Sequence, residues 1–108
     1  MDLRSAPRFP VHFPVLLGSN EIVGKGTIRN LSVWGCAVSS TAGVHRGDRL
    51  GLLLIVPDPH TPVAIDLAKV RWATPKEFGL EFLTMPHKSR THLREFLLSL
   101  RRASACVF

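Results

Sequence analysis

The chain of 108 residues has no tyrosine, two cysteines, and eight acidic residues against fourteen lysines and arginines. Cys36 and Cys106 lie far apart and form no C-x-x-C pair, which favours a reducing cytoplasmic location and argues against a cysteine metal site. The acidic residues are scattered, so no carboxylate pair indicates metal-assisted phosphodiester hydrolysis. No apolar run approaches the roughly 18–20 residues of a membrane span, so we expect no membrane insertion. The N-terminus lacks the apolar core of a signal peptide.

The chain also offers little for catalysis. Its five histidines are dispersed, and no Ser-His-Asp spacing would be brought together convincingly by strand geometry. His87 and His92, at i and i+5, do not share a helical face well enough to bind a metal. We therefore expect a binding protein and not an enzyme, with no metal and no cofactor.

The composition indicates one folded domain with a strongly basic charge balance. Hydrophobic residues make up 45% of the chain and the mean hydropathy is +0.16, values that exclude a disordered chain. The net charge of +6 and the pI of about 10.4 favour a nucleotide, a nucleic acid or an acidic protein surface as partner. A solvated basic surface would give the same charge balance, and the composition leaves both interpretations open.

Six short apolar runs, separated by glycine, proline and asparagine, predict antiparallel strands that form a small barrel, an all-β fold with one helix. The expected strands cover residues 11–17, 22–29, 35–39, 50–56, 63–72 and 78–83. The continuously apolar fourth run predicts a strand covered on both faces. In the fifth run, Val70 and Trp72 should share one side, with a bulge near Ala68 and Lys69. Gly24 and Gly26 mark either a bulge or a close backbone approach.

The C-terminal segment predicts a helix after a start signal at residues 84–86. Leu93, Phe96, Leu97 and Leu100 fall at i, i+3, i+4 and i+7 and form one apolar stripe. We expect the stripe to pack on the barrel and close one opening, although a partner could bind it instead. Residues 11–102 would then form the domain, between a flexible arginine-bearing arm at 1–10 and a loose tail at 103–108.

Two short motifs stand out. Arg4 and Arg8 form an R-x-x-x-R pair near the N-terminus, and Asn30, Ser32 and Gly35 form N-x-S-x-x-G between two predicted strands. Asparagine and serine side chains bond nearby backbone in such turns, and glycine permits positive φ there. We expect this turn to present a carboxamide, a hydroxyl and backbone amides outward, as an anion-binding nest does.

In this order the two motifs resemble the PilZ family, small bacterial domains that bind cyclic di-GMP. The family pattern is R-x-x-x-R, two strands, then [D/N]-x-S-x-x-G. The resemblance continues at Gly47, in residues 70–72 and in residues 78–82, and it covers nearly the whole chain. It implies a six-stranded antiparallel PilZ-type β-barrel with a C-terminal α-helix packed on it. It also implies second-messenger signalling that controls motility, exopolysaccharide or virulence.

The resemblance assigns cyclic di-GMP as the ligand and names the residues that would bind it. An arginine fork matches guanine O6 and N7 and can stack on a base, and Ser32 and the neighbouring amides could bond base or phosphate oxygens. Tryptophans at these positions are more often core residues than stacking platforms. The expected ligand-binding residues are Arg4, Arg8, Asn30, Ser32 and Gly35, with Val33, Trp34 and Trp72 as further candidates.

Because a rigid turn and a flexible arm would share the ligand, we expect ligand binding to fold the arm over the barrel and change the surface offered to an unidentified downstream protein. One alternative is a PilZ-like adaptor that acts through protein contacts without a nucleotide. Another is a small basic barrel that binds nucleic acid, which we consider unlikely because such a site needs exposed aromatic side chains and the phenylalanines lie in apolar runs.

Overall fold

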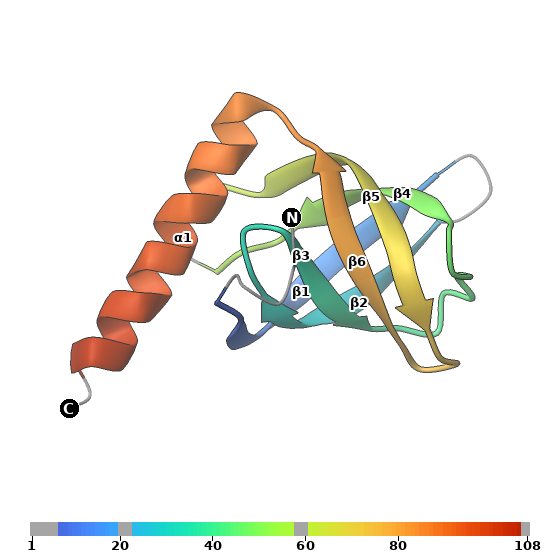
Figure 1. Ribbon diagram of the computed structural model, residues 1–108, viewed down its shortest axis with the longest axis horizontal. Coiled ribbons are helices and arrows are strands. Elements are labelled where there is room, and N and C mark those ends of the chain that lie inside the picture. Colours follow the sequence, from blue (N-terminus) through green and yellow to red (C-terminus); the bar gives the residue numbers. More distant parts are fainter. Residues whose placement is uncertain (1–6, 20–22, 58–60, 107–108) are drawn as a thin grey trace.

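The computed structural model describes residues 7–19, 23–57 and 61–106. The elements are β1 (Phe9–Gly18), β2 (Val23–Leu31), β3 (Gly35–Ser39), β4 (Arg49–Leu54), β5 (Val63–Ala73), β6 (Glu77–Thr84) and α1 (His87–Cys106). The strands close into an antiparallel barrel in the order β1-β2-β3-β6-β5-β4, with α1 at one end (Figure 1). The predicted six-stranded antiparallel barrel with one C-terminal helix is confirmed.

The hydrophobic core fills the inside of the barrel because apolar residues alternate along each strand. In β1, Phe13, Val15 and Leu17 are buried while the residues between them are exposed. β4 follows the same alternation, since Leu50, Leu52 and Leu54 are buried and the residues between them are half-buried. The prediction that this strand is covered on both faces is therefore wrong, because its second side faces outward from the barrel.

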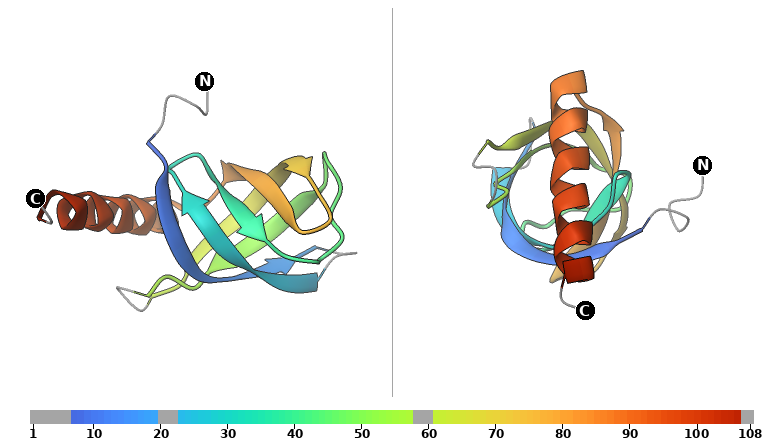
Figure 2. Two further views of the ribbon diagram at one scale, coloured as in Figure 1. Left: turned by 90° about the horizontal axis from the view of Figure 1, so that it is seen from below. Right: turned by 90° about the vertical axis from the view of Figure 1, so that its left-hand side faces the viewer.

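Helix α1 crosses one open end of the barrel (Figure 2). Its Leu93, Phe96 and Leu97 are buried, and the Phe96 ring meets Phe13 of β1 edge to face, with ring centroids 5.7 Å apart. The predicted packing of the apolar stripe on the barrel is confirmed. The helix continues to Cys106, past Ala103 where a loose tail was expected to begin, because helical hydrogen bonding continues beyond the buried stripe.

The register of β5 contains two irregularities. One register shift, between Leu67 and Ala68, lies at the place where a bulge was predicted. A second shift inserts Arg71 between Val70 and Trp72, which pair with Leu80 and Gly79 of β6. The prediction that Val70 and Trp72 share one side is therefore wrong: Val70 is fully buried, whereas Trp72 is 45% exposed on the outer face.

Two further sequence expectations concern β1 and β2. Gly24 and Gly26 pair regularly with β1, and a Cβ on Gly26 would lie only 2.7 Å from a Val38 methyl group. The close-approach interpretation of these glycines is confirmed, and the bulge interpretation is wrong. β1 begins at Phe9, two residues before the predicted strand, because the Phe9 ring packs partly buried against the core. Phe9 and Pro10 were expected to belong to a flexible arm and instead pair with β2.

Within the described ranges, no helix has the length and apolar character needed to cross a membrane.

Replacing Phe96 tests the role of the helix in the core. Phe96→Ala removes the ring that meets Phe13, and we expect the free energy of unfolding to fall by about 3–5 kcal/mol because a cavity remains. Leu98→Ala, at a 48% exposed position on the same helix, should change it by less than about 1 kcal/mol. Urea denaturation of both variants measures the difference. A loss below about 1 kcal/mol for Phe96→Ala would show that the helix is not part of the cooperative fold.

Candidate functional site

A row of paired residues crosses the outer face of four strands. Asn30 of β2 pairs with Ala37 of β3, Ala37 pairs with Gly79 of β6, and Gly79 pairs with Trp72 of β5. Directly paired residues on neighbouring strands project to the same face of a sheet. The row therefore has a floor of two small residues between a carboxamide at one end and an indole at the other.

This row lies in a surface hollow of about 380 Å³, a volume within the roughly 300–1,000 Å³ typical of small-molecule sites. The Trp72 indole lies directly over Gly79, where any Cβ would collide with the ring. Glycine at this position is therefore required to seat the indole against the strand. The hollow is lined by Arg8, Asn30, Cys36, Ala37, Arg71, Trp72, Gly79 and Leu80.

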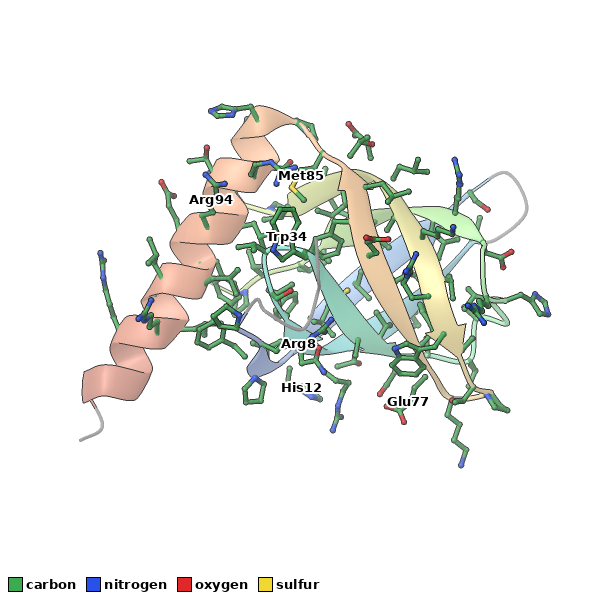
Figure 3. The ribbon with its side chains drawn as sticks, in the orientation of Figure 1. Arg8, His12, Trp34, Glu77, Met85 and Arg94 are labelled. Carbon is green, nitrogen blue, oxygen red and sulfur yellow. The ribbon has the colours of Figure 1, made fainter. Side chains whose placement is uncertain are left out.

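Arg8 stands at the Asn30 end of the hollow (Figure 3). Its Nη1 donates a hydrogen bond of 2.7 Å to Oδ1 of Asn30. Because the carboxamide is uncharged, it orients the guanidinium without neutralising it. The structure thus brings together two residues that are 22 positions apart in the sequence and that were both predicted to bind the ligand. Arg4, the other predicted arginine, lies outside the described residues.

The Ser32 hydroxyl holds the motif turn together. It accepts hydrogen bonds from the backbone amides of Trp34 (3.1 Å) and Gly35 (3.2 Å) and donates to the Gly35 carbonyl (3.4 Å). Ser32 is fully buried. The expectation that this hydroxyl and the neighbouring amides face outward is wrong in this arrangement, because they satisfy one another inside the turn.

Glycine is required at position 35 for a reason other than the predicted positive φ. Among the described residues, positive φ occurs at Gly43 (72°) and Gly47 (94°) and not at Gly35. A Cβ at Gly35 would instead collide with the carbonyl oxygen of Leu80. Gly35 therefore allows β3 to approach β6 closely, and its predicted contribution to the site is indirect.

The three further candidates occupy different surroundings. Trp72 lines the hollow and is half-exposed, so the core interpretation is wrong for this residue. The side chain of Trp34 points away from Arg8 (Figure 3), and its backbone carbonyl accepts a hydrogen bond of 2.8 Å from Phe82. Val33 lines a separate groove beside α1.

Sequence reasoning missed the roles of Arg71, Gly79 and Ala37. Arg71 lines the hollow and forms an ion pair of 3.3 Å with Glu81. By contrast, Arg8 in the same hollow is bonded to the neutral carboxamide of Asn30. Gly79, a glycine inside the apolar run at 78–83, was a usable signal of close approach. Nothing in the local sequence marks Ala37, because its place in the row depends on strand register.

Cys36 lies beneath the hollow and is buried. Burial raises the pKa of its thiol from 9.0 to about 12, and the nearby Arg8 guanidinium opposes that shift. The thiol is therefore protonated at neutral pH and acts as a small apolar side chain.

In the part of the chain that the structure describes, no group of three or more histidine, cysteine or acidic side chains is placed to hold a metal ion.

Comparisons with known proteins agree with the observed fold. A family model described as PilZ domain matches residues 2–99. No curated protein is similar enough to this chain to count as a match. The chain is similar in structure to the Bacillus subtilis inhibitor of motility (MotI/DgrA), with a TM-score of 0.75 and 19% identity over 95% of this chain. It spans about half of that protein, 53%. It is also similar to the PilZ domain of CeSA from a cellulose synthesizing bacterium, with a TM-score of 0.69 and 16% identity over 88% of this chain and 98% of that one.

Replacing Ser32 tests whether its hydroxyl holds the turn. Ser32→Ala leaves the Trp34 and Gly35 amides without their acceptor, so we expect the free energy of unfolding to fall by about 1–3 kcal/mol. Ser99→Ala, at an exposed serine on α1, should change it by less than about 0.5 kcal/mol. Thermal and urea unfolding measure both. Unchanged stability for Ser32→Ala, together with lost nucleotide binding, would assign Ser32 a direct ligand contact instead.

Proposed function

This chain belongs to the PilZ domain family, which is known for cyclic di-GMP receptors, and we propose that it binds cyclic di-GMP in the hollow between Arg8 and Trp72. The proposal depends on one observation: the Arg8 guanidinium and the half-exposed Trp72 indole line the same hollow, with Ala37 and Gly79 as its floor between them. Cyclic di-GMP has two guanines and two phosphates, so each of these features has a chemical counterpart in the ligand.

Each wall of the hollow suits one part of the ligand. The Arg8 fork can donate two hydrogen bonds to guanine O6 and N7. The exposed face of Trp72 offers a stacking surface for a purine, a contact worth roughly 1–3 kcal/mol per base. Arg71 adds positive charge for a phosphate, although its ion pair with Glu81 reduces that contribution.

The remaining motif residues act in two ways in this proposal. Asn30 positions Arg8 before the ligand arrives and can bond a guanine edge. Ser32 and Gly35 shape the turn and the close approach of β3 to β6. We assign Arg4 to a second guanine contact on the basis of its place in the R-x-x-x-R motif.

We further propose that the ligand fixes the N-terminal segment that carries Arg4 and Arg8 and thereby changes the contact with a downstream protein. Ordering each residue costs roughly 1–2 kcal/mol of backbone entropy, so a micromolar Kd, about −8 kcal/mol, is the expected affinity. One of the two similar structures is an inhibitor of motility, and the other is a PilZ domain from a cellulose synthesizing bacterium. By analogy we propose motility or exopolysaccharide control in the cytoplasm as the output.

Calorimetric titration of the full chain with cyclic di-GMP tests the ligand. We expect a saturable heat with a Kd on the order of 1 µM. Arg8→Ala and Trp72→Ala should each weaken binding by about tenfold or more, because each removes a base contact. Arg49→Ala removes an exposed arginine on β4 that does not line the hollow, so it should change the Kd by less than about twofold.

Two outcomes would contradict the proposal. An equal loss in Arg49→Ala would mean that general positive charge, and not the hollow, attracts the nucleotide. No heat from folded protein at about 100 µM ligand would instead favour a PilZ-like adaptor that acts through protein contacts alone.

A further inference from the structure

A second, apolar groove of about 500 Å³ lies between α1 and the first residues of β1. On the helix side, Arg94, Leu97, Leu98 and Arg101 line it, and their spacing of i, i+3, i+4 and i+7 places them on one helical face. This face shares Leu97 with the stripe that closes the barrel and lies beside the rest of that stripe. Leu98 is 48% exposed, a large apolar side chain left uncovered in the described structure.

The groove and the nucleotide hollow share two chain segments. Pro7 and Phe9 line the groove, whereas Arg8 between them lines the hollow. In the motif turn, Val33 lines the groove and Asn30 lines the hollow. A ligand that moves Arg8 must therefore also move the residues on either side of it, which form one wall of the groove.

The charges around the groove indicate the chemistry of its occupant. Arg94 and Arg101 lie at the two ends of its helical face, and α1 carries five lysines and arginines against one acidic residue, Glu95. A second copy of this helix would place arginine against arginine, which is unfavourable in a contact that excludes water. An apolar surface between cations fits a segment with an apolar stripe flanked by carboxylates.

We propose that this groove binds an acidic amphipathic helix of a partner protein and that cyclic di-GMP changes its affinity for that helix. Apolar side chains of the partner fill the space over Leu97 and Leu98, and its carboxylates pair with Arg94 and Arg101. The binding of the helix is argued from the groove's own lining residues, whereas the dependence on cyclic di-GMP rests on the proposed function.

A synthetic peptide tests the groove without knowledge of the natural partner. The probe is a fluorescent helical peptide of about 16 residues with leucines at i, i+3, i+4 and i+7 and glutamates elsewhere, and its counterpart has lysines in place of glutamates. We expect the full chain to bind the glutamate peptide about tenfold or more tightly than the lysine peptide, by fluorescence anisotropy.

Matched variants locate the binding. Leu98→Glu and Arg101→Glu should each weaken binding of the glutamate peptide by about tenfold. Leu16→Glu, at an equally exposed leucine on β1 (48%), and Arg102→Glu, next to Arg101 but outside the groove lining, should each change it by less than about threefold. Urea unfolding of all four variants confirms that they are folded.

Three results would overturn the groove proposal: no binding by the folded chain, equal binding of both peptides, or equal loss in the control variants. Tighter binding by about tenfold after removal of residues 1–6 would also overturn it, because the natural occupant would then be the chain's own N-terminal segment.

The effect of cyclic di-GMP is measured separately. Saturating nucleotide should change the peptide Kd by about threefold or more in the wild type and leave it unchanged in Arg8→Ala. If the nucleotide does not bind at all while the peptide does, the proposed function fails and the groove stands. If both bind without influencing each other, the coupling is wrong.

Discussion

The hydrogen bond from Arg8 to Asn30 joins the start of β1 to the end of β2. It fixes the position of Arg8, on which both proposed sites depend. A charge-assisted hydrogen bond contributes about 1.5–3 kcal/mol when water is excluded, and less at this exposed position because solvent screens it. The bond therefore orients Arg8 but can be exchanged for contacts to a ligand. Since successive residues of an extended chain face opposite ways, fixing Arg8 also fixes Pro7 and Phe9 toward α1.

Sequence periodicity was sufficient to place the strands and the helix, and the family motifs were sufficient to nominate Arg8 and Asn30 as residues of one site, although not to predict the hydrogen bond between them. The sequence pattern was not sufficient where the register between strands decides which way a side chain points. The extra residue at Arg71 turns Trp72 outward, and a period of two cannot locate such an insertion. The inward orientation of the Ser32 hydroxyl depends likewise on how the turn closes after folding, because serine can bond either its own backbone or an outside group.

The motif residues therefore divide into two groups with different physical roles. Ser32 and Gly35 stabilise the turn and the approach of β3 to β6, so changing them should act first on the fold. Arg8 and Trp72 are exposed and present polar and aromatic surface to the solvent. Asn30 already orients Arg8 and the Trp72 indole is seated on Gly79, so these two side chains need little further ordering when a ligand binds.

If a guanine stacks on Trp72 while Arg8 binds its edge, the emission of Trp72 should report the binding. In a Trp34→Phe background, Trp72 is the sole remaining tryptophan. We expect cyclic di-GMP to quench this emission saturably, at the concentrations where calorimetry detects binding, and we expect the quenching to be lost when Arg8 is replaced by alanine. Binding heat with unchanged Trp72 emission would rule out stacking on Trp72, because the nucleotide would then lie elsewhere on the barrel.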